Sequence, residues 1–386
     1  MPEHSKDYAE LKKVFSSPKP EHRPYTFFPL DGDLRDGDFI SARISEYKKA
    51  GFGGVVLQPT SATQPAYGSE EYIAAARELI EKCKKAGLQV ALCDDVDSDE
   101  RHPSGRAGGL FVAEYPQYRA KRLSMIEYIC TTGEHVERPI RKTGMLMSVC
   151  AYEVDTGETL DLREFVVGDT IVWDVPAGNW NVLQFICEDD DESDCADYLS
   201  YEASLAFLTY TYKRLLGEGD PDAVAMTVSL GIAYQTSNRR QWSPDFNRVF
   251  KKEFGFDPEP LYPALFFDIG LNTTRYTALL INCRAKMLTE GFFRALNDFT
   301  RARGIISTAS LAEPKTTAAP WLFGDGMAHH KYLGAPGVTL SRAYAYGING
   351  LKIASSAAYC WDRELVACDI FHNYYLMGRN ILYSDA

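Results

Sequence analysis

The chain has 386 residues, is 45% hydrophobic and 24% charged, and carries a formal net charge of −12. This composition suits a globular protein with a sizeable core, and the acidic balance argues against a nucleic-acid partner. The polar first residues lack the apolar stretch of a signal peptide, and no run is long and apolar enough for a membrane helix. We therefore predict a cytoplasmic protein without a nucleic-acid or membrane partner, and its oligomeric state stays open.

The nine cysteines predict neither a disulfide framework nor a zinc site. Their number is odd, they are scattered from Cys83 to Cys368, and no Cys-x-x-Cys pair occurs. We expect reduced thiols, as in a reducing cytosol.

The first quarter of the chain alternates strands and helices. Residues 6–15 predict a short amphipathic helix, and Pro18, Pro20 and Pro24 then interrupt the chain. Strands are expected at residues 25–30, 53–59 and 88–93, with helices at 39–50 and 70–86. Such alternation is typical of βαβ units around a parallel sheet.

The alternation stops near residue 119. Four short segments with β character follow up to residue 187, separated by turn sequences at 155–157 and 176–179. They predict a small antiparallel β insertion between the third strand and the helix that follows it.

Alternation resumes after the acidic run 188–194. Helices are expected at 201–216 and 275–304, and strands at 223–230, 305–311, 336–340, 365–369 and 380–383. Eight strands with helices between them predict an α/β fold, a closed (β/α)₈ TIM barrel carrying an inserted antiparallel β subdomain. The predicted segments are 1–24 (helix and linker), 25–118 (barrel), 119–195 (β insertion) and 196–386 (barrel).

Several short motifs occur in an order that resembles one enzyme family. They are Phe-Phe-Pro at 27–29, Gly-Gly-Val at 53–55, Gln-Pro at 58–59, Pro-Ser-Gly-Arg-Ala-Gly-Gly at 103–109, Val-Pro-Ala-Gly-Asn-Trp at 175–180 and Trp-Ser-Pro-Asp-Phe at 242–246. From residue 25 onward the chain resembles the α-L-rhamnosidase-related glycoside hydrolases. The resemblance implies a TIM-barrel glycosidase acting on an α-L-rhamnoside or related glycoside.

The family's catalytic carboxylates are largely missing. Glycoside hydrolysis usually needs two carboxyl groups. Family members carry Thr-Asp-Glu-Pro after the fourth strand, where this chain has Thr-Val-Ser-Leu at 227–230. After the seventh strand they carry Ser-Glu-Thr-Phe, where residues 368–371 are Cys-Asp-Ile-Phe. Asp369 thus keeps the charge on a shorter side chain.

Other residues at predicted strand ends could compensate, although each carboxylate there could equally be a surface or helix-capping group. Glu313 follows the fifth strand, and with Asp369 it is the predicted catalytic pair, both facing the barrel mouth. The candidates for sugar contacts are Asp94, Asp95, Gln58, Asp31, His372 and Trp361.

No metal ligands or cofactor are predicted from the residues. The acidic alternation at 95–99 has Glu100 where a calcium loop needs glycine, and Arg106 where it needs glutamate, so it is no EF-hand. Adjacent His329 and His330 point in different directions and make a poor metal pair. Related rhamnosidases are calcium-dependent, so the resemblance keeps calcium open.

Two functions stay open at this point. One is a glycosidase whose acids have been relocated. The other is a catalytically inactive barrel that binds carbohydrate or serves as an assembly protein. The missing pair at Val228 and Ser229 favours the second, and the family resemblance favours the first.

Overall fold

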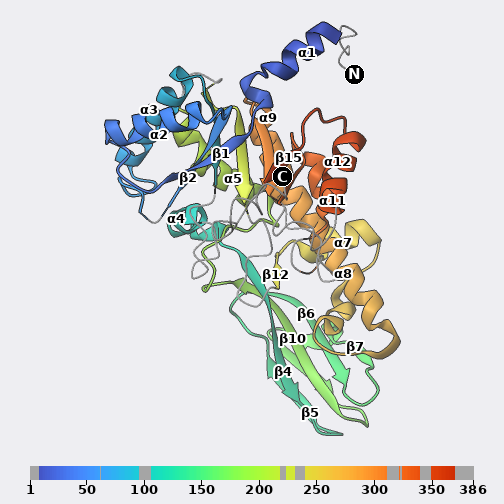
Figure 1. Ribbon diagram of the computed structural model, residues 1–386. Helices are drawn as coiled ribbons and strands as arrows, with labels where there is room; N and C mark the ends of the chain where they lie inside the picture. Colours follow the sequence, from blue (N-terminus) through green and yellow to red (C-terminus); the bar gives the residue numbers. More distant parts are fainter. Residues whose placement is uncertain are drawn as a thin grey trace, which may run out of the picture.

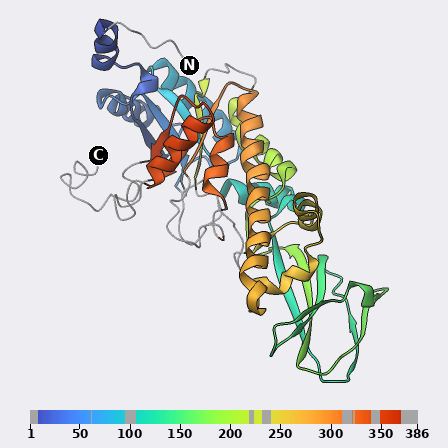
Figure 2. The same ribbon diagram turned by 90° about the vertical axis from the view of Figure 1, so that its right-hand side faces the viewer.

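The computed structural model describes residues 8–60, 62–94, 106–217, 223–230, 240–310, 321, 324–339 and 349–369. A sheet of parallel strands with helices packed on it forms one end of the molecule, and a β subdomain extends from it (Figures 1 and 2). Within the described ranges, no helix is long and apolar enough to cross a membrane.

Five parallel strands form the main sheet, in the order β1-β2-β3-β11-β13. Two further parallel strands, β14 and β15, pair with each other, and the Ala335 amide just before β14 donates to the Ser307 carbonyl of β13 at 2.9 Å. The bounds are β1 (Tyr25–Leu30), β2 (Gly54–Pro59), β3 (Gln89–Cys93), β11 (Met226–Leu230), β13 (Ile306–Ser310), β14 (Gly337–Thr339) and β15 (Ala367–Asp369).

The predicted closed barrel is not found. Seven of the eight predicted strands are present and parallel, but the described residues form a five-stranded sheet and a separate two-stranded sheet without closure. The eighth predicted strand, 380–383, lies outside the described residues. The observed fold is a mixed α/β arrangement with an open parallel sheet.

Helices follow the parallel strands and cover one face of the sheet. Side-chain caps start several of them: Asp36 accepts from the amides of Asp38 and Phe39 at the start of α2, and Ser69 accepts from Tyr72 at the start of α3. The bounds are α1 (Tyr8–Ser16), α2 (Gly37–Lys49), α3 (Glu70–Lys85), α4 (Arg106–Glu114), α5 (Tyr201–Leu208), α6 (Arg214–Leu216), α7 (Phe246–Phe254), α8 (Thr273–Leu288), α9 (Arg294–Arg301), α11 (Gly326–His329) and α12 (Asn349–Cys360).

Shorter helical turns connect these elements. Two are π-helical and lie inside longer helices, between α5 and α6 and between α8 and α9. They are η4 (Thr209–Lys213) and η8 (Thr289–Phe293); the 3₁₀ turns include η2 (Pro116–Tyr118), η6 (Glu259–Leu265) and η9 (His330–Tyr332).

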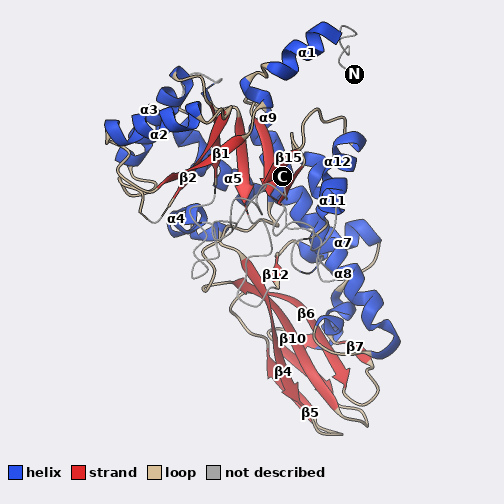
Figure 3. Ribbon diagram, viewed as in Figure 1, coloured by secondary structure: helices blue, strands red, loops and turns tan. Residues whose placement is uncertain are grey.

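The β subdomain consists of two antiparallel sheets packed face to face (Figure 3). Its inner side chains, among them Val149, Ile171, Trp173 and Val182, form a separate buried cluster. The sheets are β12-β4-β10-β6-β7 and β5-β9-β8, with bounds β4 (Lys121–Ile129), β5 (His135–Pro139), β6 (Met145–Glu153), β7 (Thr159–Asp161), β8 (Val166–Val167), β9 (Thr170–Asp174), β10 (Trp180–Asp189) and β12 (Gln241–Trp242).

Two details of the subdomain differ from the expectation. Helix α4 and turn η2 precede it, so it does not follow the third strand directly. Strand β12, which comes after β11 in the chain, returns to pair with β4. The exact domain boundaries stay a prediction.

The two chain crossings between the sheet and the subdomain are joined in a short ladder, which we call the neck. Arg119 and Ala196 form an antiparallel bridge, and the Ala120 amide donates to Cys195 at 2.8 Å. The Asp197 amide donates to the Tyr118 carbonyl at 2.8 Å. The neck therefore fixes turn η2 beside the start of α5.

The glycine at position 54 leaves room for the Tyr25 ring to lie across strand β2. The Tyr25 hydroxyl of β1 reaches over β2 and donates to the side-chain oxygen of Gln89 on β3. A Cβ atom at Gly54 would lie 2.8 Å from both the Tyr25 ring and the Gln89 carbonyl oxygen. The Tyr25 side chain therefore covers the amino end of the sheet on the face opposite the helices.

Replacing Gly54 with alanine should therefore destabilise the protein, by about 1–3 kcal/mol in the free energy of unfolding. Gly37→Ala is the matched control, because a Cβ at Gly37 meets nothing within 4 Å, and it should be neutral or slightly stabilising. Urea unfolding measures both. Equal midpoints for Gly54→Ala and wild type would contradict this account of the crossing.

The neck also predicts a pH dependence. Burial raises the pKa of Asp197 from 3.8 to about 6, so the folded protein holds this proton more tightly than the unfolded chain does. The contribution of this group to stability is therefore greatest below pH 3.8 and falls as the pH rises to about 6. Asp197→Asn should abolish that fall. Relative to wild type, the variant's free energy of unfolding should therefore be about 1–3 kcal/mol higher at pH 7 than at pH 4. Urea unfolding across this range tests it, with Asp191→Asn, at an exposed carboxylate, as the charge-matched control. If the free energies of unfolding of Asp197→Asn and wild type changed with pH in the same way, burial of this carboxylate would have no effect on the pH dependence of stability.

Candidate functional site

The carboxyl ends of the parallel strands meet at one edge of the sheet, where barrel enzymes carry their chemistry. Four of the predicted site residues lie along this edge. They are Asp31, directly after β1; Gln58, in β2; Asp94, directly after β3; and Asp369, the last residue of β15. The alternation of side chains along each strand decides which face of the sheet each one reaches.

Asp94 faces the helices. Its neighbour two positions earlier, Leu92, belongs to the core beneath the helices, whereas Cys93 belongs to the cluster on the other face. The Ser229 hydroxyl of β11 donates to the Asp94 carboxylate at 2.6 Å, and Asp94 is only 4% exposed. Asp94 therefore stabilises the helix side of the sheet and does not line its other face.

Tyrosines surround the Asp94 carboxylate. Burial and nearby charges, Asp94 among them, raise the pKa of Tyr67 well above its usual value. The pKa of Tyr212, from turn η4, is raised for the same two reasons. These tyrosines therefore stay neutral at physiological pH.

The opposite face of the sheet, the inner face, is apolar over the central strands. Val56, Ala91, Cys93 and Val228 pack together there, with partly buried Tyr25, Phe27 and Met226 against them. Gln58 lies two positions beyond Val56 on the same strand and is part-buried, which places its amide on this face at the carboxyl edge.

Asp369 stands at the carboxyl end of the last described strand. It is in register with Thr339 of β14, is part-buried, and one of its carboxylate oxygens is shielded from solvent. It is the acid that the sequence motif at 368–371 predicted at the end of this strand.

Two predicted residues have other surroundings. Asp31 is 45% exposed and lies 3.6 Å from the Arg43 guanidinium of α2, so its carboxylate is engaged by a helix. Trp361 follows α12 and precedes β15, at the amino end of that strand. Strand topology therefore separates Trp361 from the carboxyl edge.

Three further predicted residues, Asp95, Glu313 and His372, lie outside the described residues, and their roles stay predictions. The described ranges hold no group of three or more histidine, cysteine, aspartate or glutamate side chains able to bind a metal ion. The calcium loop considered at 95–99 falls outside those ranges, so the calcium expectation stays untested.

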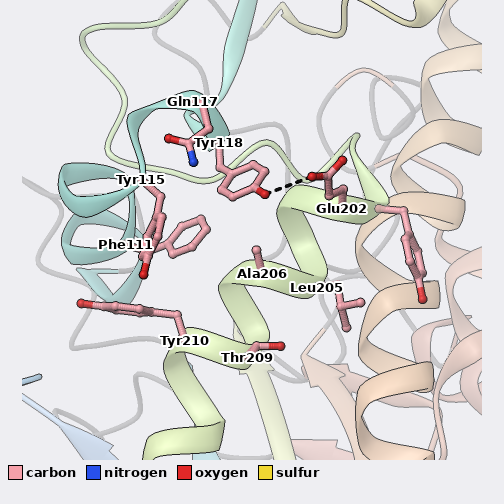
Figure 4. A pocket seen from close by; sticks show the side chains of 10 residues that line it. Phe111, Tyr115, Gln117, Tyr118, Glu202, Leu205, Ala206, Thr209 and Tyr210 are labelled. Carbon is pink, nitrogen blue, oxygen red and sulfur yellow. Dashed lines mark hydrogen bonds between the residues drawn. The ribbon is translucent and has the colours of Figure 1, made fainter.

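Sequence reasoning did not identify an aromatic groove on the helix side of the molecule, which we call the tyrosine groove. It has a volume of about 590 Å³ and lies between α4 with η2 and α5 with η4 (Figure 4). Its lining comprises Phe111, Tyr115, Gln117, Tyr118, Tyr201, Glu202, Leu205, Ala206, Thr209 and Tyr210. Part of this groove was visible as a pattern, because residues 111, 115 and 118 recur at helical spacing.

Removing the Ser229 hydroxyl should lower the stability of the protein, because the buried Asp94 carboxylate then lacks this hydrogen bond. We expect Ser229→Ala to lower the free energy of unfolding by about 1–3 kcal/mol, because a buried carboxylate loses a donor. Thr227→Val is the matched control on the same face of β11, since the Thr227 hydroxyl is buried without a hydrogen-bond partner in the described part of the chain. Chemical unfolding followed by circular dichroism compares the two. A Ser229→Ala variant as stable as Thr227→Val would mean that the hydrogen bond is dispensable.

Comparison with known proteins gives a fold but no family. No protein-family model and no curated protein sequence matches the chain. The solved structure of a rhamnosidase from Novosphingobium sp. PP1Y is similar, with a TM-score of 0.65 at 13% identity over 93% of this chain and 52% of that one. A β-galactosidase from the Antarctic haloarchaeon Halorubrum lacusprofundi has a TM-score of 0.45 at 11% identity, over 84% and 42% of the two chains, too low to support an argument. The chain spans about half the length of the rhamnosidase, and the similarity shows a glycoside-hydrolase-like fold.

Proposed function

We propose that this protein binds carbohydrate at the carboxyl edge of its parallel strands and does not hydrolyse it. The observation that carries the proposal is the Ser229–Asp94 hydrogen bond of 2.6 Å on the helix side of the sheet. At the position where the family resemblance expects a catalytic pair, this chain has a hydroxyl engaged with a buried carboxylate.

Hydrolysis needs two carboxyl groups on either side of the glycosidic bond, about 5–9.5 Å apart. Val228, which matches the first acid of the family's pair, packs in the apolar cluster of the inner face. Ser229, which matches the second, points to the helices. Among the described residues, strands β3 and β11 therefore offer no carboxylate to a sugar on that face; Asp95 lies outside those residues.

Asp369 and Gln58 are the residues that we propose for sugar contacts. Because β2 and β15 are not neighbours in the strand order, each would contact a different part of the glycoside. A carboxylate and an amide at the strand ends accept and donate hydrogen bonds to hydroxyl groups, and the apolar inner face suits the C–H surface of a sugar ring. The similarity to a rhamnosidase supports an α-L-rhamnoside or related glycoside as the ligand class.

A second function, glycoside hydrolysis by Asp369 with Glu313, is favoured by one observation. Asp369 ends a parallel strand at the edge where barrel glycosidases place a catalytic acid. Under this alternative Glu313, after the fifth strand, replaces the acids missing after the fourth strand, and Asp369 keeps the acid after the seventh.

One experiment separates the two functions. Wild type, Asp369→Asn and Glu313→Gln are assayed for release of nitrophenol from aryl α-L-rhamnosides and related aryl glycosides, and binding of the same glycosides is measured calorimetrically. We expect binding without release by wild type, and about 10-fold weaker binding by Asp369→Asn, because a charge-assisted hydrogen bond is lost.

Asp362→Asn is the matched control, since Asp362 is an exposed carboxylate of the turn that precedes β15. Its positive φ of 50° is one that asparagine also adopts, so the control should fold and bind like wild type. Hydrolysis that Asp369→Asn or Glu313→Gln slows by about 100-fold would establish the second function and overturn the first.

A further inference from the structure

The tyrosine groove is formed by different elements from the strand edge. Its walls come from the two chain segments that the neck joins, one entering the β subdomain and one leaving it (Figure 4). Phe111 is almost fully buried at its base, whereas Tyr115 and Tyr201 are each 37% exposed at its sides. The groove is therefore an open surface lined with aromatic rings and anchored in the core.

The rings are held in a fixed arrangement around Phe111. The Phe111 and Tyr118 rings are stacked, with centroids 5.7 Å apart and planes 8° apart. The Tyr115 ring lies 5.4 Å from Phe111 on another side, and the Tyr210 ring lies 5.6 Å from it. The Tyr115 and Tyr210 rings meet edge to face, with centroids 6.1 Å apart. These contacts hold the rings in place before a ligand binds.

Hydrogen-bonding groups stand around these rings. The Tyr118 hydroxyl donates to the Glu202 carboxylate at 3.0 Å, which leaves that exposed carboxylate oriented along the groove. Gln117 is a second exposed polar residue of the lining. Outside the lining, a hydrogen bond with the Glu114 carboxylate is the main cause that raises the pKa of Tyr115.

We infer that the tyrosine groove binds a pyranose ring. The C–H bonds on one face of a sugar ring are apolar and carry slight positive charge, which suits the negative face of an aromatic ring. The sugar's hydroxyl groups point outward to its edge, where Glu202 and Gln117 accept or donate hydrogen bonds. A volume of about 590 Å³ accommodates one or two such rings.

Other ligand classes fit this groove less well. The one charged lining residue is Glu202, whose carboxylate would repel a phosphorylated ligand. The guanidinium groups of Arg214 and Arg294 lie over the Tyr210 and Tyr201 rings, but they form ion pairs with other carboxylates, of Glu70 and of Glu290 and Asp298. A quaternary ammonium ion suits aromatic rings and acids, but it favours a small closed cage, and this groove is open and several times larger than such an ion. A neutral sugar matches both the shape and the polarity.

The test measures binding of methyl α-L-rhamnopyranoside, methyl β-D-galactopyranoside and cellotriose by saturation-transfer NMR and calorimetry. Tyr115→Ala should weaken binding of at least one of them about 10-fold or more. Tyr115→Phe, which keeps the ring, should stay within about 3-fold of wild type, because ring stacking supplies most of the contact. Circular dichroism of each variant checks that the fold is kept.

Tyr359→Ala is the matched control, as Tyr359 is 86% exposed on α12 and outside the groove, and it should bind like wild type. The strand edge is proposed to bind the same class of glycoside through Asp369, so groove binding is read as the part of the signal that Tyr115→Ala removes and Tyr115→Phe keeps. A loss with Asp369→Asn alone reports on the proposed function, and a loss with Tyr115→Ala alone reports on this inference. Saccharide binding that Tyr115→Ala does not weaken would overturn the inference. So would the absence of saccharide binding, whether or not tetramethylammonium, used as the cationic probe, binds in a Tyr115-dependent way.

Discussion

The alternation of side chains along parallel strands is the constraint on which this structure depends. In β3 and β11 it sends Leu92, Asp94 and Ser229 toward the helices, and Cys93 and Val228 toward the other face. A shift of one residue in either strand would exchange the two sets. The buried hydrogen bond between Asp94 and Ser229 holds this register at the edge where a glycosidase would need its acids.

The neck is a second constraint, and it acts where the chain enters and leaves the β subdomain. It holds two distant segments together, so that a helix before the β subdomain and a helix after it form one surface. The tyrosine groove is a consequence of that pairing, because Tyr115 and Tyr118 come from one segment and Tyr201 and Tyr210 from the other. The subdomain is held at a second place beside the neck, where the Trp242 indole of β12 donates to the Tyr262 hydroxyl of η6 at 3.0 Å.

Much of the fold could be predicted from local patterns. Helices α2 and α3 carry capping residues and helical apolar spacing, and seven parallel strands appear as short apolar runs in the expected places. The faces of those strands could not be predicted, because a parallel strand is apolar on both sides and its sequence does not distinguish the helix side from the other. This is why Asp94 was expected to contact a sugar.

Pairings between residues far apart in the chain could not be predicted from the sequence either. Nothing near residues 241–242 indicates that β12 joins β4, about 120 residues earlier in the chain, since the pairing depends on the folded helices between them. Phe111, Tyr115 and Tyr118 show helical spacing, but only the folded chain reveals that Tyr210 packs against Phe111. The sequence therefore predicted most of the described elements, whereas the strand faces and the tyrosine groove depend on the folded chain.

We propose that the strand edge of this fold holds a sugar without cleaving it, and a crystal structure of the full chain with a bound aryl glycoside would show whether it does. We expect an intact glycosidic bond, with Asp369 accepting a hydrogen bond from a sugar hydroxyl and no second carboxylate facing it across the bond. A cleaved glycoside between two carboxylates about 5–9.5 Å apart would instead show that the protein is a glycosidase.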